Sequence, residues 1–215
     1  MKGLLLKDWY QVRTSMKAMC LTVSFVLVIW VFSTSSDYVF PVSYAAVFLG
    51  ILSVNLLAYD HASGWTEYSF ALPLSKELQV AEKYLVGLLC TAVSAALNGI
   101  FCGILFWMGK PLPAMPIGLL LGAGAASILL INGIMLPLYY RFGAEKARML
   151  YMLMFAGMGA ALGGGAVMDE LQQNGTGSGP LPVPLWLAAV LLLVVLTLYA
   201  VSWRVSVAWY GKYKK

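Results

Sequence analysis

Six long apolar runs follow one another along the chain, with short polar segments between them. Each run contains about the 20 apolar residues that a helix needs to cross the hydrocarbon core of a bilayer. The pattern predicts an all-α membrane protein with six transmembrane helices, at residues 18–34, 38–59, 84–107, 115–140, 149–168 and 185–205. No segment between them is long enough for a soluble domain, so we expect residues 1–215 to form a single transmembrane domain.

The amino-acid composition is that of a chain whose solvent is lipid. Hydrophobic residues make up 61% of the chain and charged residues only 11%. A soluble domain carries about 25% charged residues. Because so few charges cannot cover a water-exposed surface, we expect most of the surface to face lipid.

The basic residues orient the predicted helices. Thirteen of the fourteen lysines and arginines lie before the first run, between the second and third, between the fourth and fifth, or at and beyond the end of the sixth, and only Lys110 lies on the other side. Cytoplasmic loops carry an excess of Lys and Arg. This placement predicts that both chain ends are cytoplasmic. It also excludes a nucleic-acid partner despite the net charge of +5, because the basic residues flank apolar runs and do not share one soluble face.

The segment 1–17 is predicted to form an amphipathic helix in the membrane interface. Leu5, Trp9, Val12 and Met16 recur at helical spacing, and basic residues lie between them. Trp9 and Tyr10 would then lie at the level of the lipid headgroups. The alternative is a cytoplasmic tail whose only role is to orient the chain.

The segment 60–83 is the longest predicted cytoplasmic loop. It carries large apolar side chains at Trp65, Tyr68, Phe70 and Leu72. Aromatic anchors on a polar loop are typical of a protein interface. Ser63 can cap a short helix that Pro73 would end, and Ser75 can cap the following helix. Packing of the aromatic side chains on the membrane surface is the alternative.

Small residues at a spacing of four indicate close helix packing. Gly118 and Gly122 in the fourth run, and Gly159 and Gly163 in the fifth, have this spacing. Packing within one chain is the more ordinary use of such residues, and a dimer interface is the alternative. The segment 169–184, rich in Gly, Ser, Gln and Pro, is predicted to be an outer loop that caps the bundle.

The centres of the runs hold almost no charge. Their main polar groups are Asn55, Asn98 and Asn132, which we expect to form hydrogen bonds between helices, with a substrate site as the alternative. His61 is the only histidine, so we predict an exposed loop residue and no metal site. The cysteines, Cys20, Cys90 and Cys102, are read as small apolar residues.

No catalytic or nucleotide-binding pattern is present in the sequence. The pair Gly109-Lys110 is followed by Pro111 and lacks the spaced glycine of a phosphate-binding loop. No nucleophile, base and carboxylate set can be assembled within the runs. We therefore predict that the chain is not an enzyme, and that any energy it uses comes from a partner.

Two short motifs occur in the order found in one family of transport proteins. The chain begins MKGLLLKDWY, and the segment before the third run contains an aromatic pair, a Leu-Pro and a Lys-Tyr, at Trp65, Tyr68, Leu72, Pro73, Lys83 and Tyr84. Together with the six-run hydropathy pattern, these motifs resemble the ABC-2 type permeases, which are the membrane subunits of small bacterial ABC exporters.

The resemblance implies a role for each segment. The segment 1–17 would be a connecting helix along the membrane, with Leu5, Trp9, Tyr10 and Val12 at the interface with lipid. The segment 60–83 would carry a coupling helix between helices two and three, which docks on a cytoplasmic ATP-binding subunit. Its contacts would be Ser63, Trp65, Thr66, Glu67, Tyr68 and Phe70. The outer loop 169–184 is modest beside that of large members of the family.

The same resemblance implies the assembly and its activity. Two permeases, identical or siblings, would work with two ATPase subunits in the bacterial plasma membrane. ATP and Mg²⁺ would bind the partner, and this chain would bind no cofactor. The function implied is export of a hydrophobic or amphipathic substrate, such as an antimicrobial peptide, a lipid or a drug.

Two other classes of function are left open by the residues. One is a stand-alone membrane immunity or stress protein that acts by binding and needs no ATPase. The other is a secondary transporter, which would need an ionisable group at mid-membrane. A membrane enzyme ranks last.

Overall fold

The structure is a computed structural model, and every regular element in its described part is a helix. It describes residues 2–15, 17–32, 39–69, 71, 75–110, 117–172 and 185–210. The helices are α1 (Lys2–Ser15), α2 (Lys17–Phe32), α3 (Val39–Ala62), α4 (Trp65–Ser69), α5 (Lys76–Trp107), α6 (Ile117–Gln172) and α7 (Leu185–Tyr210). The all-α class is confirmed for these residues.

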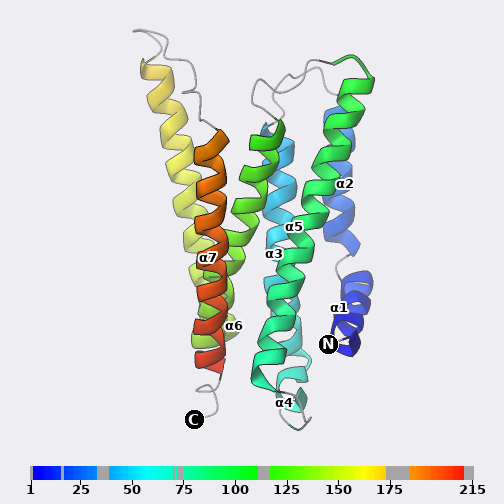
Figure 1. The fold of residues 1–215 in the computed structure, drawn as a ribbon, viewed down its shortest axis with the longest axis vertical. Helices are drawn as coiled ribbons and strands as arrows, with labels where there is room; N and C mark the ends of the chain where they lie inside the picture. The colour runs from blue at the N-terminus through cyan, green and yellow to red at the C-terminus, as the bar shows by residue number, and fades with distance from the viewer. Residues whose placement is uncertain are drawn as a thin grey trace.

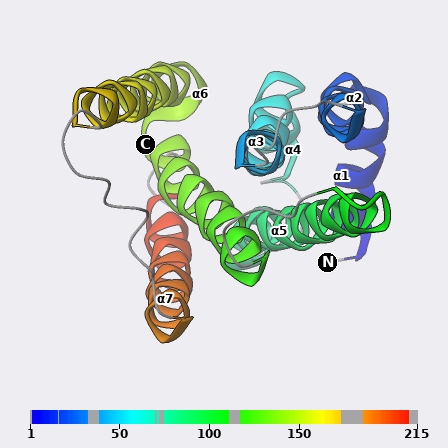
Figure 2. The same cartoon turned by 90° about the horizontal axis from the view of Figure 1, so that it is seen from above.

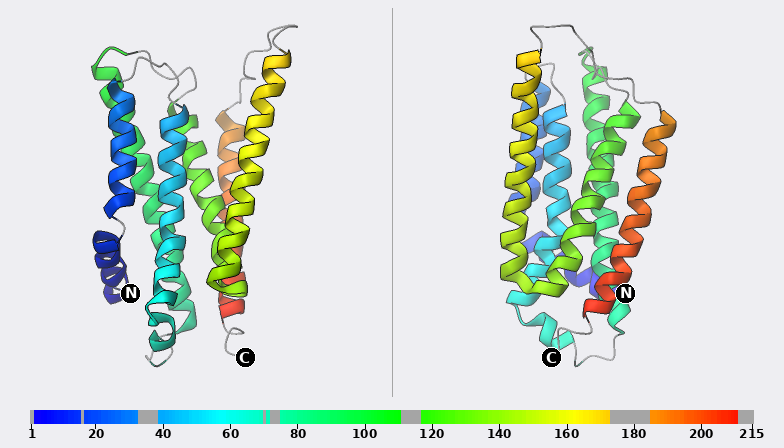
Figure 3. Two further views of the ribbon diagram at one scale, coloured as in Figure 1. Left: turned by 180° about the vertical axis from the view of Figure 1, so that it is seen from behind. Right: turned by 90° about the vertical axis from the view of Figure 1, so that its left-hand side faces the viewer.

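The long helices lie side by side along one axis (Figure 1, Figure 3). The first residues of α1, the short helix α4 and the last residues of α7 lie at the same end of this bundle (Figure 1). Seen from above, the first part of α6 lies between α5 and α7 (Figure 2). This helix packs against α3, α5 and α7, so it connects α7 to α3 and α5.

Helix α6 reverses its direction at a single glycine. Gly143 has φ 79° and ψ 177°, and residues on both sides of it are helical. A positive φ is easily adopted only by glycine, which has no Cβ. The chain therefore returns along the bundle immediately after Gly143 (Figure 3). The segment 141–148, which the sequence pattern leaves between two helices, is helical except at this residue.

Several helices are long and apolar enough to cross a membrane. Within the described residues these are Phe40–Ala62, Lys76–Trp107, Ile117–Gly143 and Val190–Tyr210. Helices α1 and α2 meet at 65°, and counting this bent pair as one span gives five. The chain is thus a multi-pass membrane protein by length and composition, and the number six stays a prediction.

The intramembrane asparagines follow the expected pattern in two of three cases. The Asn132 side-chain oxygen accepts a hydrogen bond from the Ser53 hydroxyl, which links α6 to α3. The Asn55 amide donates to the Met19 sulfur at 3.8 Å, which links α3 to α2. The Asn98 amide donates to Ser94 in its own helix at 3.4 Å, so the prediction of a bond between helices is wrong there among the described residues.

Within the described part, a close helix approach lies at a glycine other than Gly118 and Gly122. At Gly118 and Gly122 an added Cβ would meet nothing within 4 Å, so no other described segment packs closely on them. At Gly87 an added Cβ would lie 2.6 Å from the Tyr199 hydroxyl oxygen. Gly159 and Gly163 lie in the second arm of α6, where side-chain surroundings are outside the described part.

Single residues elsewhere match their predictions in most cases. Ser75 caps α5, because its hydroxyl accepts a hydrogen bond from the Leu78 amide at 3.3 Å. Cys90 and Cys102 are buried as expected, whereas Cys20 is exposed. His61 is exposed as predicted, but it lies in the last turn of α3 and not in a loop.

Candidate functional site

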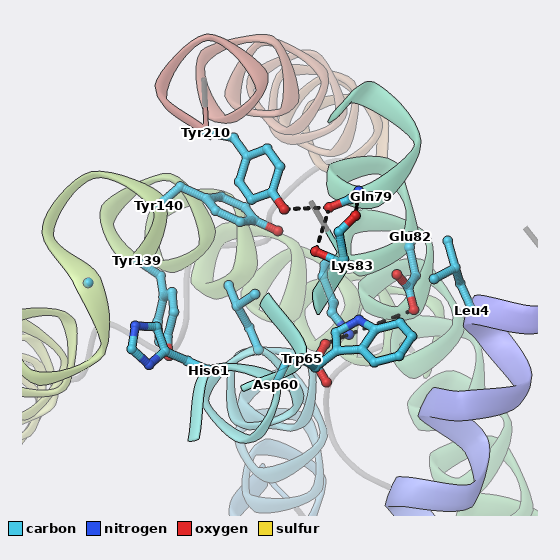
Figure 4. Close-up of a pocket in the computed structure, with 13 residues that line it drawn as sticks. Leu4, Asp60, His61, Trp65, Gln79, Glu82, Lys83, Tyr139, Tyr140 and Tyr210 are labelled. Carbon is cyan, nitrogen blue, oxygen red and sulfur yellow. Dashed lines mark hydrogen bonds and ion pairs between the residues drawn. The ribbon is translucent and has the colours of Figure 1, made fainter. Parts of the chain in front are cut away.

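A cavity lined by charged, polar and aromatic side chains lies at the end of the bundle that carries α4. Its volume is about 50 Å³. Figure 4 shows the side chains that converge on it from α1, α3, α4, α5, α6 and α7. They are Leu4, Leu57, Asp60, His61, Trp65, Ser69, Gln79, Glu82, Lys83, Tyr139, Tyr140, Gly143 and Tyr210. Nearly every helix of the bundle therefore meets at this one place.

Two lysines and two aspartates form an ion cluster beside the cavity. The Lys83 Nζ atom lies 2.8 Å from the Asp8 carboxylate and 2.7 Å from the Asp60 carboxylate. The Lys7 Nζ atom lies 2.7 Å from Asp60 and 3.1 Å from Asp8. Each aspartate thus contacts both lysines, and the cluster joins α1, α3 and α5.

Three of the four residues of the cluster are buried, and Lys7 is partly exposed. Asp8, Asp60 and Lys83 are 2%, 4% and 2% exposed. Removing such charges from water is costly, and close opposite charges together with hydrogen bonds offset that cost. A shift of α1, α3 or α5 alone would break two of the ion pairs between these helices, so the cluster couples their positions.

A third carboxylate stands next to this cluster. Glu82 is 4% exposed, and its Oε1 atom lies 3.8 Å from the Lys83 Nζ atom. That separation is too long for a hydrogen bond. Oε1 has no hydrogen-bond partner among the described residues. Glu82 is thus a buried carboxyl group beside the cluster, at ion-pair distance from Lys83 of its own helix.

Trp65 connects α4 to the ion cluster. The Lys7 Nζ atom lies 4.6 Å from the centre of the Trp65 ring, within range of a cation–π interaction. The Trp65 ring also lines the cavity, and Figure 4 shows it close to Asp60. One face of α4 thus rests on the charged groups of α1 and α3.

Gln79 connects the other end of α4 to α5 and α7. Its side-chain oxygen accepts hydrogen bonds from the Ser69 hydroxyl, at 3.1 Å, and from the Tyr210 hydroxyl. Its amide nitrogen donates to the Ser69 carbonyl at 3.2 Å. Both bonds to the Gln79 oxygen are drawn in Figure 4. Since Ser69 is the last residue of α4, this glutamine holds the end of that helix in place.

The predicted contact residues of the coupling segment do not all face outward. Tyr68 is 59% exposed, whereas Trp65 is half-buried and points into the cavity. The two rings lie 5.6 Å apart. Ser63 precedes α4, and its hydroxyl donates to the Asp60 carbonyl at 3.2 Å, so it bonds back to α3. The Thr66 and Glu67 side chains, together with all of Phe70, Leu72 and Pro73, lie outside the described part.

The predicted interfacial stripe on α1 is divided between two environments. Leu5 and Val12 pack against a buried cluster of α3 and α5. Trp9 and Tyr10 are 64% and 58% exposed. Met16 lies outside the described residues. Leu5 and Val12 are therefore packing positions, and only the two aromatic residues are free to meet lipid headgroups.

Sequence reasoning missed the residues that hold this site together. Asp8, Asp60 and Gln79 received no role from the pattern alone. A signal was available for Asp8, because it lies four residues from both Leu4 and Val12 and so shares their helix face. A carboxylate on the packing face of an amphipathic helix indicates a buried partner of opposite charge. No comparable signal marks Gln79.

The site offers no metal centre within the described residues, where no group of three His, Cys, Asp or Glu side chains is placed to bind a metal ion. The contacts of the site connect the short helix α4, at one end of the bundle, to the long helices. No curated protein and no solved structure matches the chain significantly. The family described as "ABC-2 family transporter protein", however, matches residues 3–211. A match over nearly the whole chain, on a protein whose apolar helices are long enough to cross a membrane, shows that the chain belongs to the ABC-2 family of transporter membrane proteins.

Proposed function

We propose that this chain is the membrane-spanning permease subunit of an ATP-driven exporter, and that α4 is the coupling helix on which a cytoplasmic ATPase subunit docks. The observation that carries the proposal is the attachment of α4, Trp65–Ser69, to four other helices. Trp65 rests on Lys7 of the ion cluster, and Ser69 is tied to Gln79 and through it to Tyr210. A force applied to α4 would therefore reach α1, α3, α5 and α7.

The orientation of the chain follows from the same placement. In the proposed topology six helices cross the plasma membrane and both chain ends lie in the cytoplasm. The basic residues near the α4 end support this orientation, because cytoplasmic segments are rich in Lys and Arg. The start of α1, the end of α7 and α4 would all face the ATPase (Figure 1).

In the proposed motion, the ion cluster makes α1, α3 and α5 move as one unit. Closure of the ATPase subunits would displace α4, and Trp65 would carry that displacement to Lys7. Because Lys7, Asp8, Asp60 and Lys83 share short contacts, α1, α3 and α5 would move together. Such rigid-body motion of packed helices is a common route from one conformational state to another.

The composition of the bundle interior supports the proposal of an apolar or amphipathic substrate. The described core between the helices consists of aliphatic and aromatic side chains, with neutral polar groups such as Asn132 and Ser53. Sites of this composition suit ligands with large apolar surface better than small ions. In the proposal, two permeases, identical or siblings, enclose the path of a peptide, lipid or drug. The outer loop 169–184 would lie at the far end of that path.

The test is co-purification with ATPase subunits from the same cell. Tyr68→Ala removes the most exposed aromatic side chain described on α4 without disturbing the cavity. Tyr10→Ala is the matched control, because Tyr10 is equally exposed on α1. We expect the wild type and Tyr10→Ala to bind an ATPase and stimulate ATP hydrolysis, and Tyr68→Ala to lose at least tenfold in affinity, as truncation of an interface anchor does.

Two results would overturn the proposal. If no ATPase binds the folded wild type in nanodiscs, a stand-alone membrane protein that acts by binding becomes the better reading. If Tyr68→Ala and Tyr10→Ala weaken binding equally, α4 is not the docking element.

A further inference from the structure

An apolar groove runs along the surface between the first arm of α6 and α7, away from the ion cluster. Its volume is about 310 Å³. The groove is lined by Gly133, Ile134, Pro137, Leu138, Leu198, Val201, Ser202, Val205 and Trp209. Ile134, Leu198 and Val201 are 44%, 54% and 59% exposed, so the groove opens to the outside of the bundle.

The polar groups on the floor of the groove are paired. Pro137 has no amide hydrogen, so it leaves the carbonyl of Gly133, four residues earlier, without its helical hydrogen bond. The Ser202 hydroxyl donates to that carbonyl and also bonds to the Tyr84 hydroxyl. The surface offered to an occupant is therefore hydrocarbon, which water and polar ligands do not favour.

A cation lies at one end of this groove. The Arg141 guanidinium lies 4.8 Å from the ring of Trp209, which lines the groove, and 5.1 Å from the ring of Phe142. Arg141 is exposed. Among the residues whose side chains the structure describes, no carboxylate lies within ion-pair distance of it. A positive charge held between two rings at the edge of the apolar band matches the phosphate level of a bilayer.

The length of the groove matches one leaflet. From Gly133 to Arg141 the chain advances eight residues, which is roughly 12 Å along a helix. The hydrocarbon half-thickness of a bilayer is about 15 Å. A chain lying in the groove with its charged end at Arg141 would thus reach from the headgroup level almost to the midplane.

We propose that this groove binds one anionic phospholipid, with the phosphate on Arg141 and an acyl chain along Pro137 and Leu198. The occupant is set by the combination of an apolar channel one leaflet long and a cation at its headgroup end. Trp209 fixes the junction between the two, since its ring touches both. The site is independent of the proposed ATPase docking, because none of its residues belongs to α4 or the ion cluster.

The test measures lipid binding to the purified full chain in detergent by native mass spectrometry. The probes are phosphatidylglycerol and phosphatidylcholine with identical acyl chains. We expect the wild type to bind phosphatidylglycerol more tightly. Arg141→Gln should lower the affinity for phosphatidylglycerol about fivefold, because one basic group near an anionic lipid contributes about that factor. The variant should then bind phosphatidylglycerol and phosphatidylcholine equally. Arg204→Gln, which removes an exposed cation outside the groove, should change neither.

A second variant tests the groove separately from the charge. Val201→Trp places an indole in the channel and should weaken binding of both lipids. Leu191→Trp, at a similarly exposed position of α7 outside the groove, is its control. If Val201→Trp lowers the unfolding midpoint, Ile134→Trp replaces it as the filling variant.

Three outcomes would overturn the proposal. The first is a preference for phosphatidylglycerol that survives in Arg141→Gln. The second is an equal loss in Arg141→Gln and Arg204→Gln. The third is unchanged lipid binding in Val201→Trp together with conversion of a dimer to a monomer, which would assign the groove to a second copy of the chain.

Discussion

Around Lys83, three helices are joined by ion pairs, whereas from the next residue of α5 onward the same helix meets its neighbours only through neutral groups. The Tyr84 hydroxyl bonds to the hydroxyls of Ser202 and Ser206, both at 2.7 Å, and the Tyr199 hydroxyl donates to the Tyr84 carbonyl at 2.7 Å. Charges in the centre of a bilayer are costly, while hydroxyl pairs are tolerated there. The charged residues of α5 are therefore confined to its first part, and Lys83 is the last of them.

The two regions also differ in how tightly they specify geometry. Removing one member of a buried ion cluster leaves an uncompensated charge on the others, which is strongly destabilising. Neutral hydrogen bonds between membrane helices contribute about 0.6 kcal/mol each on average. We expect substitutions in the charged region to have the larger effects, and the following predictions test that ranking.

The largest effect is expected from Lys83→Met, which keeps the length of the side chain and removes its charge. Asp8 and Asp60 would be left with Lys7 alone, at the cost of about 3–5 kcal/mol in the free energy of unfolding that breaking a buried ion pair carries. Thermal unfolding in nanodiscs measures it. Lys76→Met, at an exposed position of the same helix, is the control. A shift no larger than that of the control would show that the cluster does not hold α1, α3 and α5 together.

An intermediate effect is expected from Gly87→Ala in the neutral region. Its Cβ would lie 2.6 Å from the Tyr199 hydroxyl oxygen, which is held by its bond to Tyr84. Overpacking of this kind costs about 1–3 kcal/mol. Adding Tyr199→Phe removes the clashing oxygen and should restore most of the loss, whereas Gly99→Ala, with nothing within 4 Å, should not destabilise. Additive losses in the double variant would contradict the proposed contact.

The smallest effect is expected from Ser53→Ala. It removes the hydroxyl that donates to Asn132, and Asn132 keeps its own bond to the Ile128 carbonyl at 3.1 Å. We expect a loss of about 0.6 kcal/mol, the average for a hydrogen bond between membrane helices. Unfolding of Ser53→Ala and Asn132→Ala, singly and together, measures the coupling. A loss as large as that of Lys83→Met would remove the distinction between the two regions.

Part of the α4 end could be predicted from residues adjacent in the chain. The N-cap at Ser75 depends only on its neighbour three residues on, and the prediction is confirmed. Reading Leu5 and Trp9 as one stripe was less successful, because periodicity shows that two residues share a side of a helix but not what that side meets. Leu5 meets α3 and α5, and Trp9 remains exposed. Likewise, the spacing of Gly118 and Gly122 indicated close packing that their described surroundings do not provide.

The sequence by itself determined that the chain is helical, apolar enough for a membrane and asymmetric in charge. These properties are sums over neighbouring residues, so hydropathy and charge position suffice to read them. Only the tertiary structure decided that Asp8 meets Lys83, 75 residues away, and that Lys7 meets Asp60, 53 residues away. It also decided that Gly143 reverses α6 and that Arg141 comes to lie on Trp209. Such pairings depend on how whole helices pack, and the energy that selects them is shared among contacts that no local pattern contains.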